Sequence, residues 1–382
     1  MSKRIPAGPA GDTARLDNLT LARKEGWHHH VYAAPRQQPE MLSIKQLAAL
    51  EPRDLAAHNR KRAVWHANLG PLRTPMLEEL HEDLADILGS NQQDGDKAKG
   101  AIGVDAGPGQ GKTTAALAYA KKLHQDIVLE YGAFTDDGHE RWPVCRVGLT
   151  GNTGIRDFNR AMLRFYGHPG SERGSAGDFA DRALDCVLAC ETKLIIVDDL
   201  HFLKMNEKAS VEVSNHFKYI ANEFPVTLLF IGMDLGARGL FSEGSSYADL
   251  VLGQSGRRTT PLTMRTFTID TEEARYDWRN TLLAIEQRLV LANKYPGMLA
   301  DVLSDYLFAR STGIIGSLIT VINRGCQRAI RQGVECLDEK LLDKVKIDGA
   351  AESAFKEMMQ AFASGRLTSK PGRKPTRRHR GL

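Results

Sequence analysis

Two hydrophobic patterns divide the chain. From residue 101 to about 270, short apolar runs alternate with stretches in which apolar positions recur every three or four residues, and beyond 270 only the second pattern continues. The short runs predict buried strands and the periodic stretches predict amphipathic helices. The expected strands are residues 101–104, 144–149, 194–197, 226–232 and 266–269. The helices expected between them are residues 112–124, 155–166, 179–190 and 207–224.

Helical periodicity also appears on both sides of this region. Upstream, Thr74 would cap a helix that begins at Pro75 and has leucines on its apolar face at 77, 80, 84 and 88. Downstream, helices are expected near residues 272–293, 298–310, 315–332, 338–345 and 353–362.

Strands that alternate with helices form parallel βαβ units, which bind ligands at the carboxyl ends of the strands. We therefore expect an α/β fold in which helices flank a parallel sheet and a helical lid follows. The N-terminal part either docks a partner through Trp27 and Tyr32 or is flexible. In sequence order, the expected parts are an irregular or helical N-terminal segment (1–72), an α/β core (73–270), a helical lid (271–348), and a short helix with a disordered basic tail (349–382).

The amino-acid composition indicates a globular protein that does not span a membrane. The 382 residues are 42% apolar and 26% charged, which is usual for a globular protein. No apolar run approaches the roughly 18 residues of a membrane-spanning helix, and the N-terminus has no apolar export signal. Five scattered cysteines without a Cys-x-x-Cys pair are typical of reduced thiols. We expect a cytoplasmic protein with no membrane partner.

A glycine-rich turn follows the first expected strand and precedes a helix. This context is typical of a P-loop, in which backbone N–H groups and the helix N-terminus surround phosphate oxygens. Lys112 would reach the β- and γ-phosphates of ATP, and the Thr113 hydroxyl would bind Mg²⁺. Ala106 stands where the usual pattern has glycine, which the turn should tolerate. The candidate ATP-binding residues are Gly107, Pro108, Gly109, Gln110, Gly111, Lys112, Thr113 and Thr114.

Two acids close the apolar run at 194–197. Asp198 would hold Mg²⁺ opposite Thr113, because P-loop enzymes place a carboxylate at the end of such a strand. AAA+ ATPases usually have a Glu at the next position to polarise the attacking water, whereas this chain has Asp199. Its shorter side chain predicts slow hydrolysis, since a misplacement of about 1 Å can cost about 100-fold in rate.

Two other positions match AAA+ site features. Asp234 follows the strand at 226–232, where AAA+ proteins carry a polar sensor, although it is also consistent with a turn residue. Arg257 and Arg258 stand where ring-forming AAA+ proteins place an arginine finger that reaches the γ-phosphate of a neighbouring subunit. The alternative for this pair is a solvated loop.

These motifs and their surroundings resemble the TniB/TnsC family of AAA+ transposition regulators over residues 62–345. The narrower signals are Trp65–Thr74, Val147–Gly154 with the helix after it, and Ser311–Leu318. The resemblance implies an ATP-loaded protein that forms a homo-oligomeric ring or filament on duplex DNA and recruits or activates a DDE transposase. Asp199 departs from the family pattern, as does the lack of an arginine at 314–318, where a second sensor often stands.

Positive charge favours DNA as a partner at two places. Arg156, Arg160 and Arg164 recur every four residues and would form a stripe along one helix face, which is also consistent with a solvated surface. The net charge of +4 is concentrated in residues 366–382, which contain seven Lys or Arg and no acid. Residues 371–375 resemble an AT-hook peptide, although a nonspecific tail explains them equally well. The candidate tail contacts are Arg373, Lys374, Arg377 and Arg378.

Two alternative functions remain open from the sequence. A helicase loader or initiator-like ATPase would use the same nucleotide site with a helicase partner. A signalling P-loop ATPase would bind ATP, hydrolyse little and act only through protein contacts. The lack of a repeat-bearing sensor domain after the lid counts against the signalling class.

Overall fold

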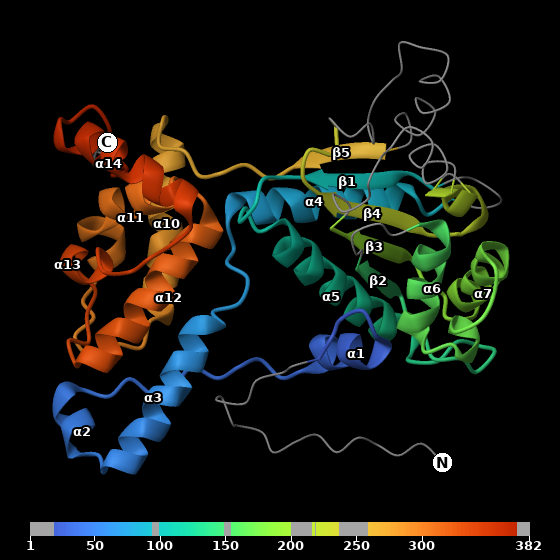
Figure 1. Ribbon diagram of the computed structural model, residues 1–382, viewed down its shortest axis with the longest axis horizontal. Helices are drawn as coiled ribbons and strands as arrows, with labels where there is room; N and C mark the ends of the chain where they lie inside the picture. The colour runs from blue at the N-terminus through green and yellow to red at the C-terminus, as the bar shows by residue number, and fades with distance from the viewer. Residues whose placement is uncertain are drawn as a thin grey trace, which may run out of the picture. The chain divides into compact units, whose positions relative to one another are not determined.

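The computed structural model describes residues 19–93, 99–148, 154–199, 216–217, 219–236 and 259–372 (Figure 1). The chain divides into two compact units, each built from separated segments. The core unit contains the described residues of 17–33 and 76–265. The helical unit contains the described residues of 34–75 and 266–382. Both units therefore differ from the sequence-order parts, because residues before 76 are divided between them.

A parallel five-stranded sheet forms the centre of the core unit. The strand order is β2-β3-β4-β1-β5, and every neighbouring pair is parallel. Every residue of β3 and β4 is buried. This arrangement confirms the expected α/β class. The strands are β1 (Ala101–Asp105), β2 (Val144–Gly148), β3 (Leu194–Asp198), β4 (Thr227–Gly232) and β5 (Thr259–Thr263).

The expected strand at 266–269 is wrong. The fifth strand is Thr259–Thr263, which lies at the edge of the sheet beside β1 among the described strands. Its sequence includes Pro261, which edge strands tolerate. Most of its positions are exposed, so the strand has no apolar pattern that the sequence analysis could detect. The apolar residues that suggested the later strand belong to the helical unit, where the Phe267 backbone N–H donates to the Gly313 carbonyl at 2.9 Å.

Helices of the core unit pack on the sheet and on one another. α6 packs against β2 and α7, and α1 packs against α5. Ser175 caps α7 in a reciprocal hydrogen-bond pair with Asp178, which explains where that helix begins. The expected helix at 207–224 lies partly outside the described residues. The core-unit helices are α1 (Lys24–Tyr32), α4 (Pro75–Ser90), α5 (Lys112–Tyr131), α6 (Ile155–Tyr166), η1 (Pro169–Ser171) and α7 (Ala176–Ala189).

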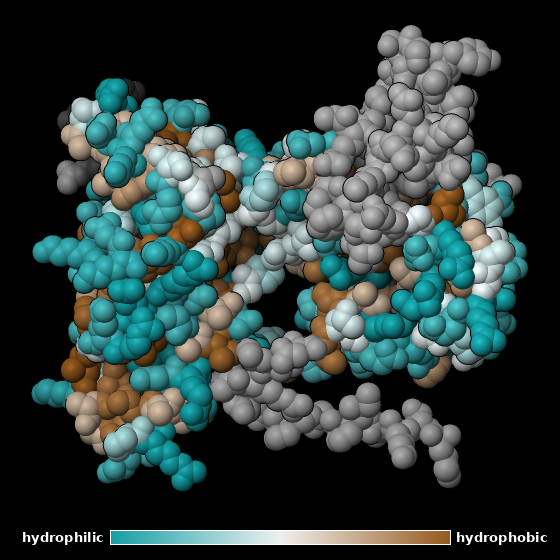
Figure 2. Space-filling view, in the orientation of Figure 1, coloured by the Kyte–Doolittle hydropathy of each residue, from teal (hydrophilic) through white to brown (hydrophobic). Residues whose placement is uncertain are grey.

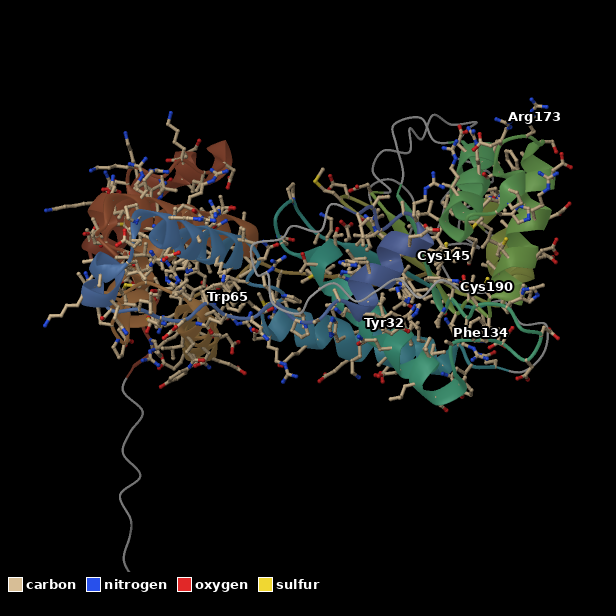
Figure 3. The ribbon with its side chains drawn as sticks, turned by 90° about the horizontal axis from the view of Figure 1, so that it is seen from below. Tyr32, Trp65, Phe134, Cys145, Arg173 and Cys190 are labelled. Atoms are coloured by element: carbon tan, nitrogen blue, oxygen red, sulfur yellow. The ribbon has the colours of Figure 1, made fainter. Side chains whose placement is uncertain are left out.

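Trp27 fixes α1 to the core unit. It is 0% exposed, and its indole N–H donates to Nδ1 of His124 on α5 at 3.1 Å. Trp142 also packs edge-on against His124. Trp27 is therefore part of the hydrophobic core and does not dock a partner, whereas Tyr32 remains 45% exposed (Figure 3).

The helical unit combines the expected lid with an earlier segment of the chain. Trp278, which is fully buried, contacts Phe267 and Phe308 edge-on. α12 buries the helix face that carries its apolar residues, as its periodicity predicts. The elements are α2 (Ile44–Ala49), α3 (Pro52–Ala67), α10 (Glu272–Arg288), the π-helical turn η3 (Met298–Val302), α11 (Ser304–Ser311), α12 (Ile315–Gln332), α13 (Glu339–Leu342) and α14 (Gly349–Ala363).

A buried ion pair joins α3 to this unit. The Arg62 guanidinium donates to both Glu335 carboxylate oxygens at 2.6 and 2.9 Å, and both side chains are less than 5% exposed. The Trp65 indole donates to the Arg288 carbonyl at 2.6 Å, which places Trp65 among the lid helices (Figure 3). Residues around α3 are therefore an integral part of the helical unit.

The cysteines are free, and Cys145 and Cys326 are buried. Burial raises the pKa of both thiols, which lowers their reactivity. Within the described ranges, no cluster of His, Cys, Asp and Glu is suited to hold a metal ion. None of the described helices is both long and apolar enough to cross a bilayer.

We predict that acid destabilises the fold through His124. Desolvation, with a smaller effect of His28, lowers the pKa of His124 to about 4 from an ordinary value of 6.5. The unfolded chain therefore binds more protons between these values, and stability falls as the pH drops from about 6.5 to 4, by roughly 3 kcal/mol for this residue. Urea unfolding across this range should show the loss.

His124→Gln should reduce the pH dependence, because an amide oxygen still accepts the Trp27 hydrogen bond but does not titrate. His66 and His216, whose pKa values burial lowers to about 3 and about 4, would supply the remaining slope. The exposed His139→Gln serves as the control and should leave the slope unchanged. An unaltered slope in His124→Gln would contradict the assignment.

Candidate nucleotide-binding site

The P-loop joins β1 to α5 at the carboxyl end of the sheet. Gly109 and Gly111 have φ values of 75° and 86°, in the left-handed region that glycine adopts without strain. α5 begins at Lys112 with Gly111 as its N-cap and has no side-chain cap. Its first N–H groups and the positive end of the helix dipole therefore suit an anion.

Two side chains fold back into this turn. The Gly107 N–H donates to Oε1 of Gln110 at 2.7 Å, and Lys112 Nζ donates to the Gly107 carbonyl at 3.3 Å. The Lys112 ammonium group is thus already held inside the loop. A phosphate oxygen is a stronger acceptor than a carbonyl for this cation.

Thr113 and Asp198 meet from opposite sides of the site. The Thr113 hydroxyl donates to Oδ1 of Asp198 at 3.3 Å, although the two residues are 85 positions apart. Asp198 ends β3 and is 2% exposed. A hydroxyl and a carboxylate are the hard oxygen ligands that Mg²⁺ prefers. The uncapped helix, the lysine and these two oxygen donors together fit a Mg²⁺-bound triphosphate.

Arg146 is a site residue that the sequence analysis missed. Its guanidinium donates to Oδ2 of Asp198 at 2.7 Å, and the side chains are 18% and 3% exposed. β2 and β3 pair in register with Gly148 beside Asp198, so Arg146 lies two residues earlier on the neighbouring strand, on the same face of the sheet. An arginine inside an apolar strand was the available signal.

Asp199 has an unusual backbone conformation. Its φ is 62°, and its N–H donates to Oδ1 of Asp198 at 3.1 Å. Asp is several-fold enriched among residues that adopt positive φ. Glu191 and Glu335 also have positive φ in this chain, so the backbone conformation alone does not explain why Asp stands at position 199.

The segment after β4 lies beside the P-loop. The Ala106 N–H donates to the Gly232 carbonyl at 3.3 Å, and the Gly236 N–H donates to the Asp105 carboxylate at 3.4 Å. Asp234 lies in this segment, is exposed and has a φ of 55°. Its position is consistent with a sensor, and its role stays a prediction. Arg257 and Arg258 lie outside the described residues.

The arginine stripe on α6 is engaged within the core unit. Nε of Arg156 donates to the Gly174 carbonyl at 3.1 Å, and Nε of Arg160 donates to the Ser171 carbonyl at 3.0 Å. Glu172 pairs with Arg160 at 2.9 Å and with Arg164 at 3.6 Å. These contacts fix the loop before α7 to α6. At the tip of this loop, Arg173 points away from the fold (Figure 3). The tail candidates Arg373, Lys374, Arg377 and Arg378 lie outside the described residues.

We predict that Arg146→Ala destabilises the core unit by about 3 to 5 kcal/mol, because it leaves a buried carboxylate without its cation. Asp198→Asn in the same chain should restore much of this loss, since a neutral amide does not need a cation. Urea unfolding of the two single variants and the double variant measures the coupling.

Arg141→Ala is the matched control for this cycle. Arg141 is a more deeply buried arginine of the core unit, and it pairs with Glu191 at 2.9 Å instead of Asp198. Its effect should add to that of Asp198→Asn without compensation. Additive effects of Arg146→Ala and Asp198→Asn would refute the coupling.

One family model matches part of the chain. A family model described as an AAA domain matches residues 95–241. No curated protein matches the sequence. Three solved archaeal structures are similar in fold. The Aeropyrum pernix ORC1 protein in complex with DNA is 15% identical, with 80% of this chain and 72% of that chain covered and a TM-score of 0.50.

The Aeropyrum pernix ORC2 protein, in ADPNP and ADP complexes, is 17% identical, with coverage of 80% and 75% and a TM-score of 0.54. Cdc6p from Pyrobaculum aerophilum is 14% identical, with coverage of 80% and 84% and a TM-score of 0.50. At these identities the likeness shows the fold alone. The narrower resemblance to TniB and TnsC remains a prediction from sequence. The chain has the AAA+ P-loop fold, in which helices flank a parallel five-stranded sheet and a helical C-terminal region is present.

Proposed function

We propose that this protein is an ATP-dependent AAA+ regulator of DNA transposition, which oligomerises on duplex DNA and recruits or activates a DDE transposase at the target site. The observation that carries the nucleotide part is the meeting of Lys112, Thr113 and Asp198 around the uncapped start of α5. The transposition part rests on the sequence segments that resemble TniB and TnsC.

Each residue of the candidate site would have a distinct role in the proposed function. Bound Mg²⁺-ATP supplies the transferable γ-phosphoryl group. Lys112 would exchange the Gly107 carbonyl for phosphate oxygens, and Thr113 and Asp198 would hold the metal ion. Arg146 would orient the Asp198 carboxylate when no metal is bound, through the ion pair that the two side chains form.

Slow hydrolysis is consistent with a recruiter. Asp199 would orient or deprotonate the attacking water, with a shorter reach than Glu. Arg257 or Arg258 would act on the γ-phosphate of a neighbouring subunit, so that hydrolysis depends on assembly. A long-lived ATP state then leaves time for the transposase to bind before the oligomer disassembles.

DNA contact in this proposal is mainly electrostatic. Arg156 and Arg160 use some of their guanidinium N–H groups on the loop before α7, and the remaining ones would donate to phosphate. The tail residues Arg373, Lys374, Arg377 and Arg378 would add further contacts. One of the structures with a similar fold, the ORC1 protein, is a complex with DNA.

A second candidate function is an initiator-like ATPase or helicase loader. The fold likeness to two ORC proteins and to Cdc6p favours it. The nucleotide site and DNA contacts would be the same, and the partner would be a replicative helicase instead of a transposase. Co-purification of the DNA-bound, ATP-loaded protein with either partner separates the two functions.

We predict that ATP, or a nonhydrolysable analogue, drives the full chain into large assemblies on duplex DNA, which sedimentation can measure. Lys112→Ala should weaken ATP binding by at least about tenfold, because a hydrogen bond to a charged group contributes about 1.5–3 kcal/mol. It should therefore prevent assembly. Lys122→Ala, on the same helix with a 77% exposed side chain, is the control and should assemble normally. A wild-type monomer under these conditions would rule out the proposed function.

We also predict that Asp199→Asn slows hydrolysis without loss of ATP binding. Removal of a general base typically costs about 10²–10⁴-fold in rate. The affinity for ATP should change little, since Asp198 and Thr113 would still hold the metal. Steady-state phosphate release and calorimetric ATP titration measure the two quantities. Unchanged phosphate release would show that Asp199 is not the base.

A further inference from the structure

A basic groove lies on the helical unit. Its volume is about 380 Å³. One wall is α12 and the other is the segment that follows α13. Five cations line the groove, which are Arg324, Arg328, Arg331, Lys344 and Lys346. Among the described residues, no acid lines it. In Figure 2 the surface over α12 and α13 is largely hydrophilic.

The three arginines form a row. They stand at spacings of four and three residues on α12, which places them on one face of the helix. The opposite face is buried in the helical unit, including Ile322 and Cys326. With a rise of 1.5 Å per residue, the row from Arg324 to Arg331 extends for about 10 Å.

The second wall is held in place by its backbone. The Arg310 guanidinium donates to the Val345 carbonyl at 2.6 Å, and the Arg324 guanidinium donates to the Lys346 carbonyl. A Cβ at Gly325 would lie 2.5 Å from Cδ2 of Leu342, so α13 packs closely on α12 at this glycine. The groove is therefore a preorganised feature of the unit.

Most of these cations lack a compensating charge. Arg328, Arg331, Lys344 and Lys346 form no ion pair within the described part of the chain. The nearby acids have other partners, since Asp343 accepts a hydrogen bond from Tyr306 and Glu352 pairs with Arg310. Five like charges in a concave site repel one another and attract polyanions.

We propose that this groove binds the phosphate backbone of duplex DNA, an inference that rests on the proposed function. Phosphates of one DNA strand follow one another along the backbone, and the long side chains of a row of about 10 Å can reach neighbouring phosphates. Arginine forks suit phosphate, and five cationic side chains line the groove. The contact is therefore independent of sequence.

The test measures DNA affinity against salt concentration with the full chain, a nonhydrolysable ATP analogue and a labelled duplex of random sequence. Arg324→Ala/Arg328→Ala/Arg331→Ala should lower the slope of log K against log salt by about 2 to 3, because each phosphate contact contributes about 0.9. Its affinity for the ATP analogue should equal that of the wild type.

Lys45→Ala/Lys122→Ala/Lys356→Ala removes the same charge from exposed positions and is the control, with no change in slope expected. Arg328→Ala/Arg331→Ala leaves the Arg324 contact with Lys346 intact and should lower the slope by about 2. This variant guards against loss of folding in the triple variant. Replacement of the three arginines by lysine should keep the slope, since the charge remains.

Two results separate this inference from the proposed function. If the wild type binds DNA with ATP and the triple alanine variant keeps its slope, the groove is not a DNA contact and the proposed function stands. If the wild type does not bind DNA, both are wrong. A triple variant that loses binding to a polyglutamate peptide and retains DNA binding would also overturn the inference, because the groove would then bind an acidic protein segment.

Discussion

The arrangement of the candidate nucleotide-binding site depends on the Asp198 carboxylate. It is 2% exposed and carries a charge that burial would make costly without partners. Thr113, Arg146 and the Asp199 N–H all donate to it, from α5, from β2 and from the chain that leaves β3. One acid thus joins the P-loop helix to two neighbouring strands. A metal ion at this position would bind to a carboxylate that is already oriented.

The helical unit depends on a comparable buried charge. Arg62 and Glu335 pair at 2.6 Å although they are 273 positions apart in the sequence. Glu335 also accepts from the Ala292 N–H at 3.1 Å, so one carboxylate joins α3 to two loops of the lid. A buried pair of this kind is weak evidence for net stability, but loss of one partner is costly. The Arg62–Glu335 pair therefore determines where α3 docks within the unit and contributes less to the stability of the unit.

The sequence predicted those parts of the site that local chemistry determines. Lys112, Thr113 and Asp198 follow from the P-loop and from an acid at the end of a buried strand, and strands 101–104, 144–149 and 194–197 follow from apolar runs. β5 was missed because an edge strand needs no apolar pattern. Arg146 and the packing of α3 in the helical unit were missed for another reason: the partners of Arg146 and Arg62 lie 52 and 273 positions away, and spacing along the chain does not indicate which charges meet.

The distribution of arginine partners bears on where DNA would bind. Arg156 and Arg160 on α6 already donate to the carbonyls of Gly174 and Ser171, so a phosphate contact there must replace existing hydrogen bonds or use the N–H groups that remain. Arg328 and Arg331 on α12 form no ion pair among the described residues. A phosphate contact at these two arginines would therefore break no ion pair, unlike one at Arg160. The spacing of the arginine stripe on α6 suggested DNA binding. In the structure these arginines hold the loop before α7 against α6.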